Sequence, residues 1–205
     1  MDTNGVILAL ATGYVLGSIP FGLILTRLTG AGDLRSIGSG STGATNVLRT
    51  GRKGLAAATL LLDLVKGFAA VWVTGQLMHG PVALAGLAAI IGHCFPVWLG
   101  FRGGKGVATL MGVSLGLAWP IGMAYAVVWL GTLALTRISS LAGMSAALAA
   151  PLTALAIGRS DLAVVLTVLA LLVIFLHRAN ITRLRAGSEP RVGSGANKDA
   201  GGSKA

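Results

Sequence analysis

Long apolar segments follow one another along most of this 205-residue chain. Several have the length of about 17–25 residues that an α-helix needs to cross the hydrocarbon core of a bilayer. Seven segments can be drawn, at residues 4–27, 55–78, 81–100, 106–118, 119–136, 140–157 and 160–178. Only 11% of the residues are charged, compared with about 25% in an ordinary soluble domain. The sequence therefore predicts an all-α integral membrane protein, a polytopic bundle of about seven transmembrane helices.

Two parts of the chain fit this description less simply. The segment at residues 106–118 is short for a complete span, so an arrangement of five spans with re-entrant pieces stays open. Residues 1–185 are expected to form one membrane-embedded domain. Residues 186–205 are rich in glycine, serine and lysine and poor in large apolar side chains, which favours disorder. We therefore expect a polar tail there that is dispensable.

Lysine and arginine are concentrated in alternate connectors, and this pattern indicates how the bundle is oriented. Cytoplasmic connectors carry the excess of positive residues in membrane proteins. The first, third and fifth connectors and the carboxyl-terminal segment hold nearly all of them. With seven spans, the amino terminus lies outside and the carboxyl terminus lies in the cytoplasm. The net charge of +10 follows mainly from this topology, and nucleic acid is not an expected partner.

The first connector contains SIGSGSTGATNVLR, residues 36–49, a glycine- and hydroxyl-rich stretch before an arginine. Glycines let a backbone approach a ligand closely, and successive free N–H groups form a concavity that binds anions. An arginine can hold a phosphate group with two parallel hydrogen bonds. The stretch predicts a phosphate cradle formed by Ser39, Gly40, Asn46 and Arg49. A plain flexible connector is the alternative, and the absence of a following Gly-Lys-Ser/Thr argues against nucleotide binding.

Two further basic elements are expected on the same side of the membrane. In FRGGKG, residues 101–106, Lys105 lies among glycines just before a helix whose free N–H groups would face an anion. After the last span, His177 and Asn180 recur at nearly helical spacing, so one face can present both. Ser140 follows Arg137 at another corner. Positive anchors at the membrane surface are the alternative interpretation of these basic residues.

A few polar residues lie inside the apolar segments. Asp63 and Lys66 are three residues apart and can face each other on one helix, so we expect an internal structural pair. His93 either orients the neighbouring lysine loop or satisfies a buried backbone group. Three scattered histidines, one cysteine and six acidic residues predict no metal site. No cofactor is expected.

Seven motifs occur in order between about residue 17 and residue 189: GSIPFG, LRSIGSGSTGATNVLR, LDLVKG, GHCFP, FRGGKGVAT, ISSLAG and HRANITRLRAGSE. Together they resemble the bacterial acyl-phosphate:glycerol-3-phosphate acyltransferase family, PlsY. Ser41 stands where many members have asparagine, and the polar tail is extended. The resemblance implies a seven-helix enzyme of the bacterial inner membrane whose site faces the cytoplasm.

The resemblance also implies a reaction. A fatty acyl group would pass from acyl phosphate to the 1-hydroxyl of glycerol 3-phosphate, giving lysophosphatidic acid and phosphate in phospholipid biosynthesis. The enzyme that makes acyl phosphate would be a functional partner. Site residues implied by motif match are Ser39, Arg49, Lys105, Ser140, His177 and Asn180, of which Lys105, Ser140 and His177 are candidates for catalysis.

Three questions stay open on the sequence. The general base is either His177, whose ordinary pKa suits the task, or an oxygen of the acyl phosphate itself. A membrane transporter for phosphorylated solutes would share the basic glycine loops. A lipid-modifying transferase with another anionic donor would share them as well.

Overall fold

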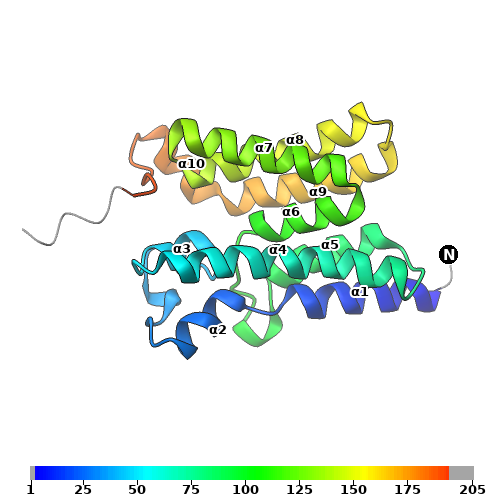
Figure 1. The fold of residues 1–205 in the computed structure, drawn as a ribbon, viewed down its shortest axis with the longest axis horizontal. Coiled ribbons are helices and arrows are strands. Elements are labelled where there is room, and N and C mark those ends of the chain that lie inside the picture. The colour runs from blue at the N-terminus through cyan, green and yellow to red at the C-terminus, as the bar shows by residue number, and fades with distance from the viewer. Residues whose placement is uncertain (1–2, 194–205) are drawn as a thin grey trace, which may run out of the picture.

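The computed structural model describes residues 3–193, and every regular element within that range is helical (Figure 1). Each of the seven predicted apolar segments contains one long helix. These are α1 (Thr3–Gly17), α4 (Lys53–Gln76), α5 (Val82–Cys94), α6 (Val107–Leu117), α7 (Trp119–Thr136), α8 (Ser139–Ala156) and α9 (Ser160–Leu176). Shorter elements are α2 (Phe21–Leu28), α3 (Ala44–Leu48), α10 (Arg178–Arg185) and the 3-10 turns η1 (Leu34–Ser36) and η2 (Val97–Leu99).

The helical class is confirmed, whereas seven complete spans remain a prediction. Five segments within the described range are long and apolar enough to cross a membrane, and α9 with α10 adds a sixth if this pair, bent by 60°, is one span. Helix α6 has 11 residues. At about 1.5 Å per residue it reaches roughly 17 Å, well short of a hydrocarbon core about 30 Å thick.

Glycines allow two pairs of helices to pack closely. A Cβ atom at Gly13 or Gly17 of α1 would collide with the backbone of Ala85 or Ala89 in α5. Likewise, a Cβ atom at Gly67 of α4 would collide with the carbonyl oxygen of Thr109 in α6. Small residues serve this purpose in bilayers, where helices associate through close packing because lipid is as apolar as the side chains.

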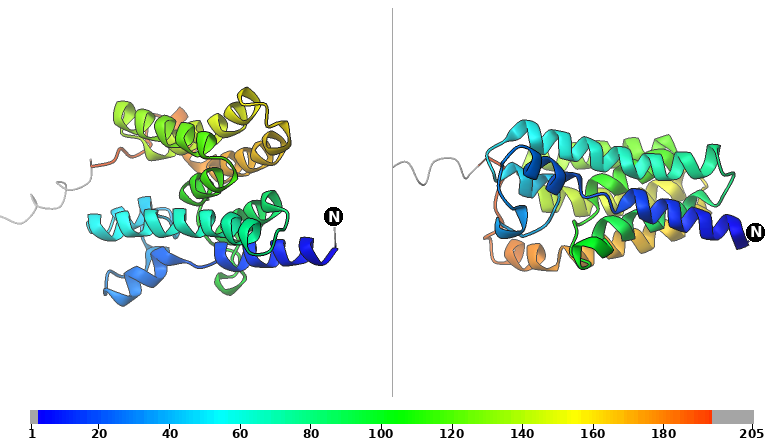
Figure 2. Two further views of the ribbon diagram at one scale, coloured as in Figure 1. Left: turned by 45° about the vertical axis from the view of Figure 1, so that its right-hand side comes forward. Right: turned by 90° about the horizontal axis from the view of Figure 1, so that it is seen from below.

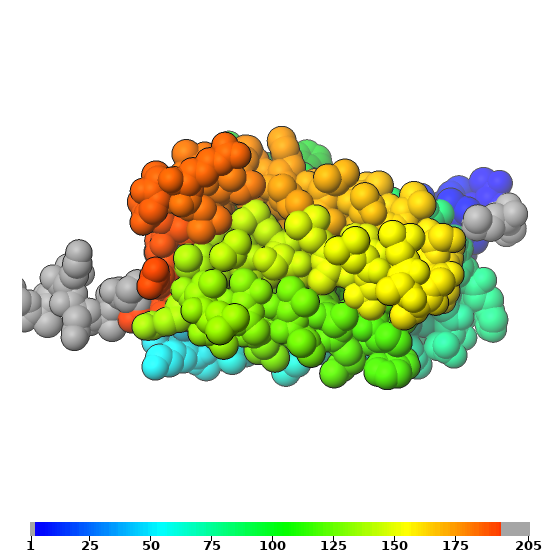
Figure 3. Space-filling model, turned by 90° about the horizontal axis from the view of Figure 1, so that it is seen from above, coloured from blue at the N-terminus to red at the C-terminus, as the bar shows by residue number. Residues whose placement is uncertain are grey.

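The helices run up and down, so the connectors gather at two ends of the bundle. Figures 1 and 2 show the amino terminus of α1 and the turn between α8 and α9 at one end, and α2, α3 and α10 at the other. Helices α7, α8 and α9 lie side by side over one face (Figure 3). Beneath them, the main core is formed by buried side chains that include Leu110, Ile121, Tyr125, Leu166 and Leu169.

The start of α6 lies inside the bundle. Gly67, which packs on Thr109 of the first turn of α6, is about 14 residues, or roughly 21 Å, along α4 from its first residue, Lys53. Helix α5 ends at Cys94, and the chain then passes through η2 before α6 begins. Lys105, two residues before α6, is therefore recessed from the end of the bundle at which α4 begins.

Candidate functional site

A cavity of about 1010 Å³ lies where five regions of the chain meet. It is lined by residues of the first connector, the glycine loop before α6, the start of α8, the junction of α9 with α10, and the segment after α10. Among the lining residues are Ser39, Arg49, Lys105, Ser140, His177 and Asn180. The structure thus brings together six predicted residues that are scattered between positions 39 and 180.

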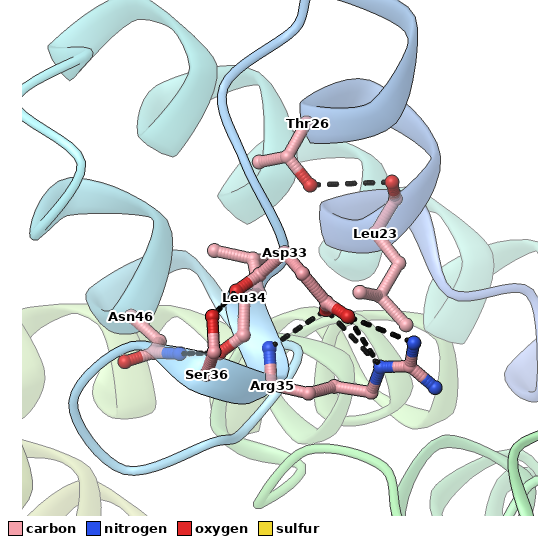
Figure 4. A network of polar contacts seen from close by, with 7 residues as sticks. All are labelled: Leu23, Thr26, Asp33, Leu34, Arg35, Ser36 and Asn46. Carbon is pink, nitrogen blue, oxygen red and sulfur yellow. Dashed lines mark hydrogen bonds and ion pairs between the residues drawn. The ribbon is translucent and has the colours of Figure 1, made fainter.

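The first connector is built on the 3-10 turn η1 (Figure 4). Asp33 caps this turn by accepting a hydrogen bond from the backbone N–H of Arg35 at 3.0 Å, and the Arg35 guanidinium pairs with the same carboxylate at 2.8 Å. The buried Asn46 side chain then ties η1 to α3, because its Nδ2 donates to the carbonyl oxygen of Leu34 at 2.8 Å. The loop between them is therefore held at both ends.

Asn46 and Gly40, both predicted to bind phosphate, shape this loop. Asn46 Nδ2 also donates to the carbonyl oxygen of Ser41 at 2.9 Å, while Oδ1 accepts from the Ser39 N–H and from Arg49 Nη1, both at 3.3 Å. Its amide is thus occupied within the loop, and it orients Arg49. Gly40 has a φ of +68°, and neither residue is among those that line the cavity. Phosphate binding by these two residues stays a prediction, and the contacts seen here are structural.

Gly38 is a residue whose individual role the sequence did not reveal. Its φ is +55°, and a Cβ atom there would collide with the Arg49 guanidinium and with Asn46 Oδ1. Gly38 therefore leaves the space through which Arg49 reaches the cavity. Nothing in the sequence separates it from the other glycines of the stretch.

Lys105 extends from a turn that is folded back onto α5. The backbone N–H groups of Gly103 and Gly104 donate to the carbonyl oxygens of Cys94 and His93 at 3.0 and 3.1 Å. Lys105 Nζ donates to Asn180 Oδ1.

The surroundings of the Lys105 ammonium change its acidity. Burial lowers the pKa of Lys105 to about 8, the nearby Glu189 carboxylate opposes this shift, and the charges of Arg183 and Arg49 add to it. The ammonium therefore loses its proton more readily than an exposed lysine does.

The Glu189 carboxylate accepts hydrogen bonds from three side chains at the cavity. Ser140 Oγ and Asn180 Nδ2 both donate to Glu189 Oε1 at 2.6 Å, and Arg183 Nε donates to Oε2 at 2.7 Å. Although burial raises the pKa of Glu189, these three hydrogen bonds hold it below its usual range. The carboxylate fixes the two predicted site residues Ser140 and Asn180 relative to each other.

The described structure includes the first part of the predicted polar tail, residues 186–193, and places Glu189 at the cavity. The N–H of Val192 donates to the carbonyl oxygen of Arg137 at 2.7 Å, and Arg137 Nη2 donates to the carbonyl oxygen of Val192 at 3.0 Å. Residues 189–193 line the cavity. The remainder of the predicted tail, residues 194–205, lies outside the described residues.

His177 presents one ring nitrogen in a defined state. It lies between α9 and α10 and is only 3% exposed. Its Nδ1 lies 2.7 Å from the carbonyl oxygen of Val173. A carbonyl oxygen can only accept, so Nδ1 carries the hydrogen and Nε2 of the neutral ring is left as an acceptor.

An apolar crevice adjoins the polar cavity. Leu60, Val107, Ala108 and Trp129 line both, and Met111 and Tyr125 complete the crevice. Its walls belong to α4, α6 and α7. The arrangement places cations and hydroxyl donors beside an apolar surface.

Comparison with known proteins shows the family. The model of the family described as "Glycerol-3-phosphate acyltransferase" matches residues 7–187. The chain belongs to the glycerol-3-phosphate acyltransferase family. A family member from Novosphingobium aromaticivorans is 71% identical over 92% of this chain and 95% of its own length. Another, from Erythrobacter litoralis, is 60% identical over 91% of this chain and 95% of its own length.

Solved structures of acyltransferases in this family have the same fold. The crystal structure of PlsY (YgiH), described as an integral membrane glycerol 3-phosphate acyltransferase in its glycerol 3-phosphate form, aligns with a TM-score of 0.85. Sequence identity is 38%, with coverage of 92% of this chain and 96% of that one. The lysophosphatidic acid form of PlsY aligns with a TM-score of 0.82 at 36% identity, over 91% and 94% of the two chains. The resemblance drawn from the motifs is therefore confirmed.

The acyltransferase family assignment answers one of the questions left by the sequence. This chain is an integral membrane acyltransferase of phospholipid biosynthesis rather than a transporter. The predicted internal pair is also confirmed, since Lys66 Nζ lies 2.7 Å from Asp63 Oδ1 and both side chains are 3% exposed.

Proposed function

We propose that this acyltransferase uses acyl phosphate as its donor and transfers the acyl group to the 1-hydroxyl of glycerol 3-phosphate. The observation that carries the proposal is the convergence of Arg49, Lys105 and several hydroxyl and amide donors on one cavity that continues into an apolar crevice. Two phosphate groups repel each other in solution. A site that brings them together needs positive charge and aligned donors, with an apolar surface beside them for the fatty chain.

The donor is already activated, which agrees with the kinds of side chain present. Acyl phosphate is a mixed anhydride, so the protein has to orient a hydroxyl towards the carbonyl rather than form a covalent acyl-enzyme. Orientation of two reactants can lower a barrier by several kcal/mol, of order 7–11 in the best cases. Donors that face the developing oxyanion contribute about 3–4 kcal/mol each in known enzymes.

Each site residue has a part in the proposed step. Ser39 and Arg49 bind phosphate, Lys105 neutralises the departing phosphate or the oxyanion, and Asn180 with Ser140 holds glycerol 3-phosphate. The hydroxyl oxygen forms the new ester bond to the carbonyl carbon, and the bond from that carbon to the phosphate oxygen breaks. The hydroxyl proton passes either to His177 Nε2 or to an oxygen of the acyl phosphate, and lysophosphatidic acid and inorganic phosphate leave.

We propose that the site faces the cytoplasm from the inner membrane. The end of the bundle that carries α2, α3 and α10 also carries most of the lysines and arginines, and the amino terminus lies at the other end (Figure 1). Positive residues are enriched on the cytoplasmic side of membrane proteins.

The donor is tested with detergent-solubilised protein, acyl phosphate and glycerol 3-phosphate. Release of inorganic phosphate together with formation of lysophosphatidic acid is expected, and acyl-CoA in place of acyl phosphate should give no product. Acyl transfer from acyl-CoA but not from acyl phosphate would refute the proposed donor.

A further inference from the structure

Four buried polar side chains form a cluster behind Lys105 that the proposed chemistry does not use. Lys66 is paired with Asp63, and Asp63 Oδ1 lies 3.7 Å from His93 Nδ1. Thr109 Oγ1 lies 3.1 Å from the same ring nitrogen. Lys66 Nζ also donates to the carbonyl oxygen of Ile19 at 2.7 Å. Ionisable groups at membrane depth are costly to bury, so their arrangement beside a site points to a functional role.

The far side of the His93 ring is in contact with the turn that carries Lys105. A Cβ atom at Gly104 would collide with His93 Nε2 and would lie 2.9 Å from Cε1 and 3.1 Å from Cδ2. The backbone N–H of Gly104 also donates to the carbonyl oxygen of His93. His93 therefore contacts Gly104 through both its ring and its backbone. Lys105 is the residue that directly follows Gly104.

We propose that His93 is a positioning residue, whose ring, held by Thr109, fixes the turn at Gly104 and so directs Lys105 Nζ into the cavity. The inference rests on the proposed role of Lys105. A lysine side chain is long and flexible, so it does not fix the position of its own ammonium group. The position of the Cα atom, which the backbone sets, limits where that group can reach. Misplacement of a catalytic group by about 1 Å can cost about 100-fold in rate.

The contact between His93 and Gly104 is tested by exchanging size across it. Gly104→Ala and His93→Ala are each expected to lower kcat/KM for acyl transfer to glycerol 3-phosphate by about tenfold or more. In the double variant, the new methyl group occupies space that the imidazole has left. We expect its activity to exceed that of Gly104→Ala alone, as coupled neighbours are not additive.

The matched control is Gly131→Ala in α7, where an added Cβ atom meets nothing within 4 Å. It should retain wild-type activity. If the double variant loses activity by the product of the two single losses or more, the positioning role is refuted. If the His93 ring only contacted the substrate, the activity lost in His93→Ala would not return when a methyl group is added at Gly104.

The hold on the ring is tested at Thr109. Thr109→Val removes the hydroxyl group that lies beside His93 Nδ1 at nearly unchanged volume, whereas Thr109→Ser keeps it. We expect Thr109→Val to lower kcat with little change in the thermal unfolding midpoint. Thr109→Ser should keep a kcat close to that of the wild type. Equal activity of the Val and Ser variants would overturn this part of the inference.

Lys105→Ala separates failure of this inference from failure of the proposed function. Each variant is assayed with whichever acyl donor the wild type accepts, so an incorrect donor assignment leaves the test intact. Wild-type activity in Lys105→Ala would refute the role of Lys105, and the positioning role with it. Loss of activity in Lys105→Ala, together with wild-type activity in His93→Ala, would refute the positioning role alone.

Discussion

Lys105 donates a hydrogen bond to the side chain of Asn180, although 75 residues separate them in the sequence. Lys105 lies in the loop before α6 and Asn180 lies in α10, so this contact joins two cavity-lining regions that are far apart in the sequence. Asn180 in turn donates to Glu189, and Ser140 donates to the same carboxylate oxygen. These residues therefore form one connected hydrogen-bond network. A substitution at one of them is expected to change the positions of the others.

The activity is expected to fall at alkaline pH because Lys105 loses its charge. Its pKa is lowered to about 8, so the ammonium group is protonated below that pH and neutral above it. If the charge is needed, kcat/KM should drop by about tenfold per pH unit above pH 8. Bound phosphates favour the charged form, so the corresponding fall in kcat should occur at a higher pH. Initial rates measured between pH 6 and 10 check both statements.

Lys105→Arg supplies the control for this pH profile. Arginine stays charged throughout the range, so whatever activity the variant retains should lack the alkaline fall. An unchanged alkaline fall in Lys105→Arg would assign the titration to another group. Lys105→Ala should reduce turnover to near background in protein that elutes as a folded species.

Removal of the His177 imidazole should affect turnover more than binding. Its Nδ1 is held by the carbonyl oxygen of Val173, which leaves Nε2 of the neutral ring as a hydrogen-bond acceptor. We expect His177→Ala to lower kcat by about 100-fold, with a much smaller change in the KM for glycerol 3-phosphate. An effect confined to KM would assign His177 to binding and leave the proton to an oxygen of the acyl phosphate.

Addition of one methyl group at Gly38 should disable the phosphate cradle. The left-handed φ of Gly38 disfavours any side chain, and the new Cβ atom would displace Arg49. We expect Gly38→Ala to lower kcat/KM by about tenfold or more. Gly54→Ala is the matched control, since a Cβ atom there meets nothing within 4 Å. Similar losses in both variants would mean that the cradle does not depend on this space.

Truncations after α10 should separate the part of the chain that builds the site from the part that does not. A chain that ends at Gly193 keeps Glu189 and the contact of Val192 with Arg137, and we expect it to be active. A chain that ends at Gly187 leaves Ser140, Asn180 and Arg183 without their shared acceptor, and should lose both activity and thermal stability. Activity in the shorter chain would show that Glu189 is not required.

Cysteine labelling in spheroplasts tests the proposed orientation. Thr29 directly follows α2, Ser160 begins α9, and both are exposed, whereas the native Cys94 is buried. The two helix ends lie at opposite ends of the bundle (Figure 1). A membrane-impermeant maleimide should label Ser160→Cys in intact spheroplasts and Thr29→Cys only after lysis. The reverse pattern would place the site on the outer side.

The sequence predicted residues whose side chains have a distinctive chemistry. It missed roles that depend on where a side chain points in the folded protein. Arg49, Lys105 and His177 could be selected because each is a basic residue in or beside a polar connector, and the structure places all three at one cavity, while their roles stay predictions. Asn46 looked identical to a phosphate ligand, and only the fold shows that its amide is directed into its own loop. Glu189 escaped notice because the glycine- and serine-rich composition around it favours disorder, while its order depends on donors in α8 and α10.

The recessed start of α6 has a consequence for how material moves through the enzyme. On the proposed function, glycerol 3-phosphate reaches Lys105 from the aqueous phase, while the fatty acyl chain stays in the hydrocarbon region of the bilayer beside the bundle. The newly made lipid would then depart sideways, with its charged head already near the level of the surrounding headgroups. The charged substrate therefore does not have to enter the hydrocarbon core, and the acyl chain does not have to enter water.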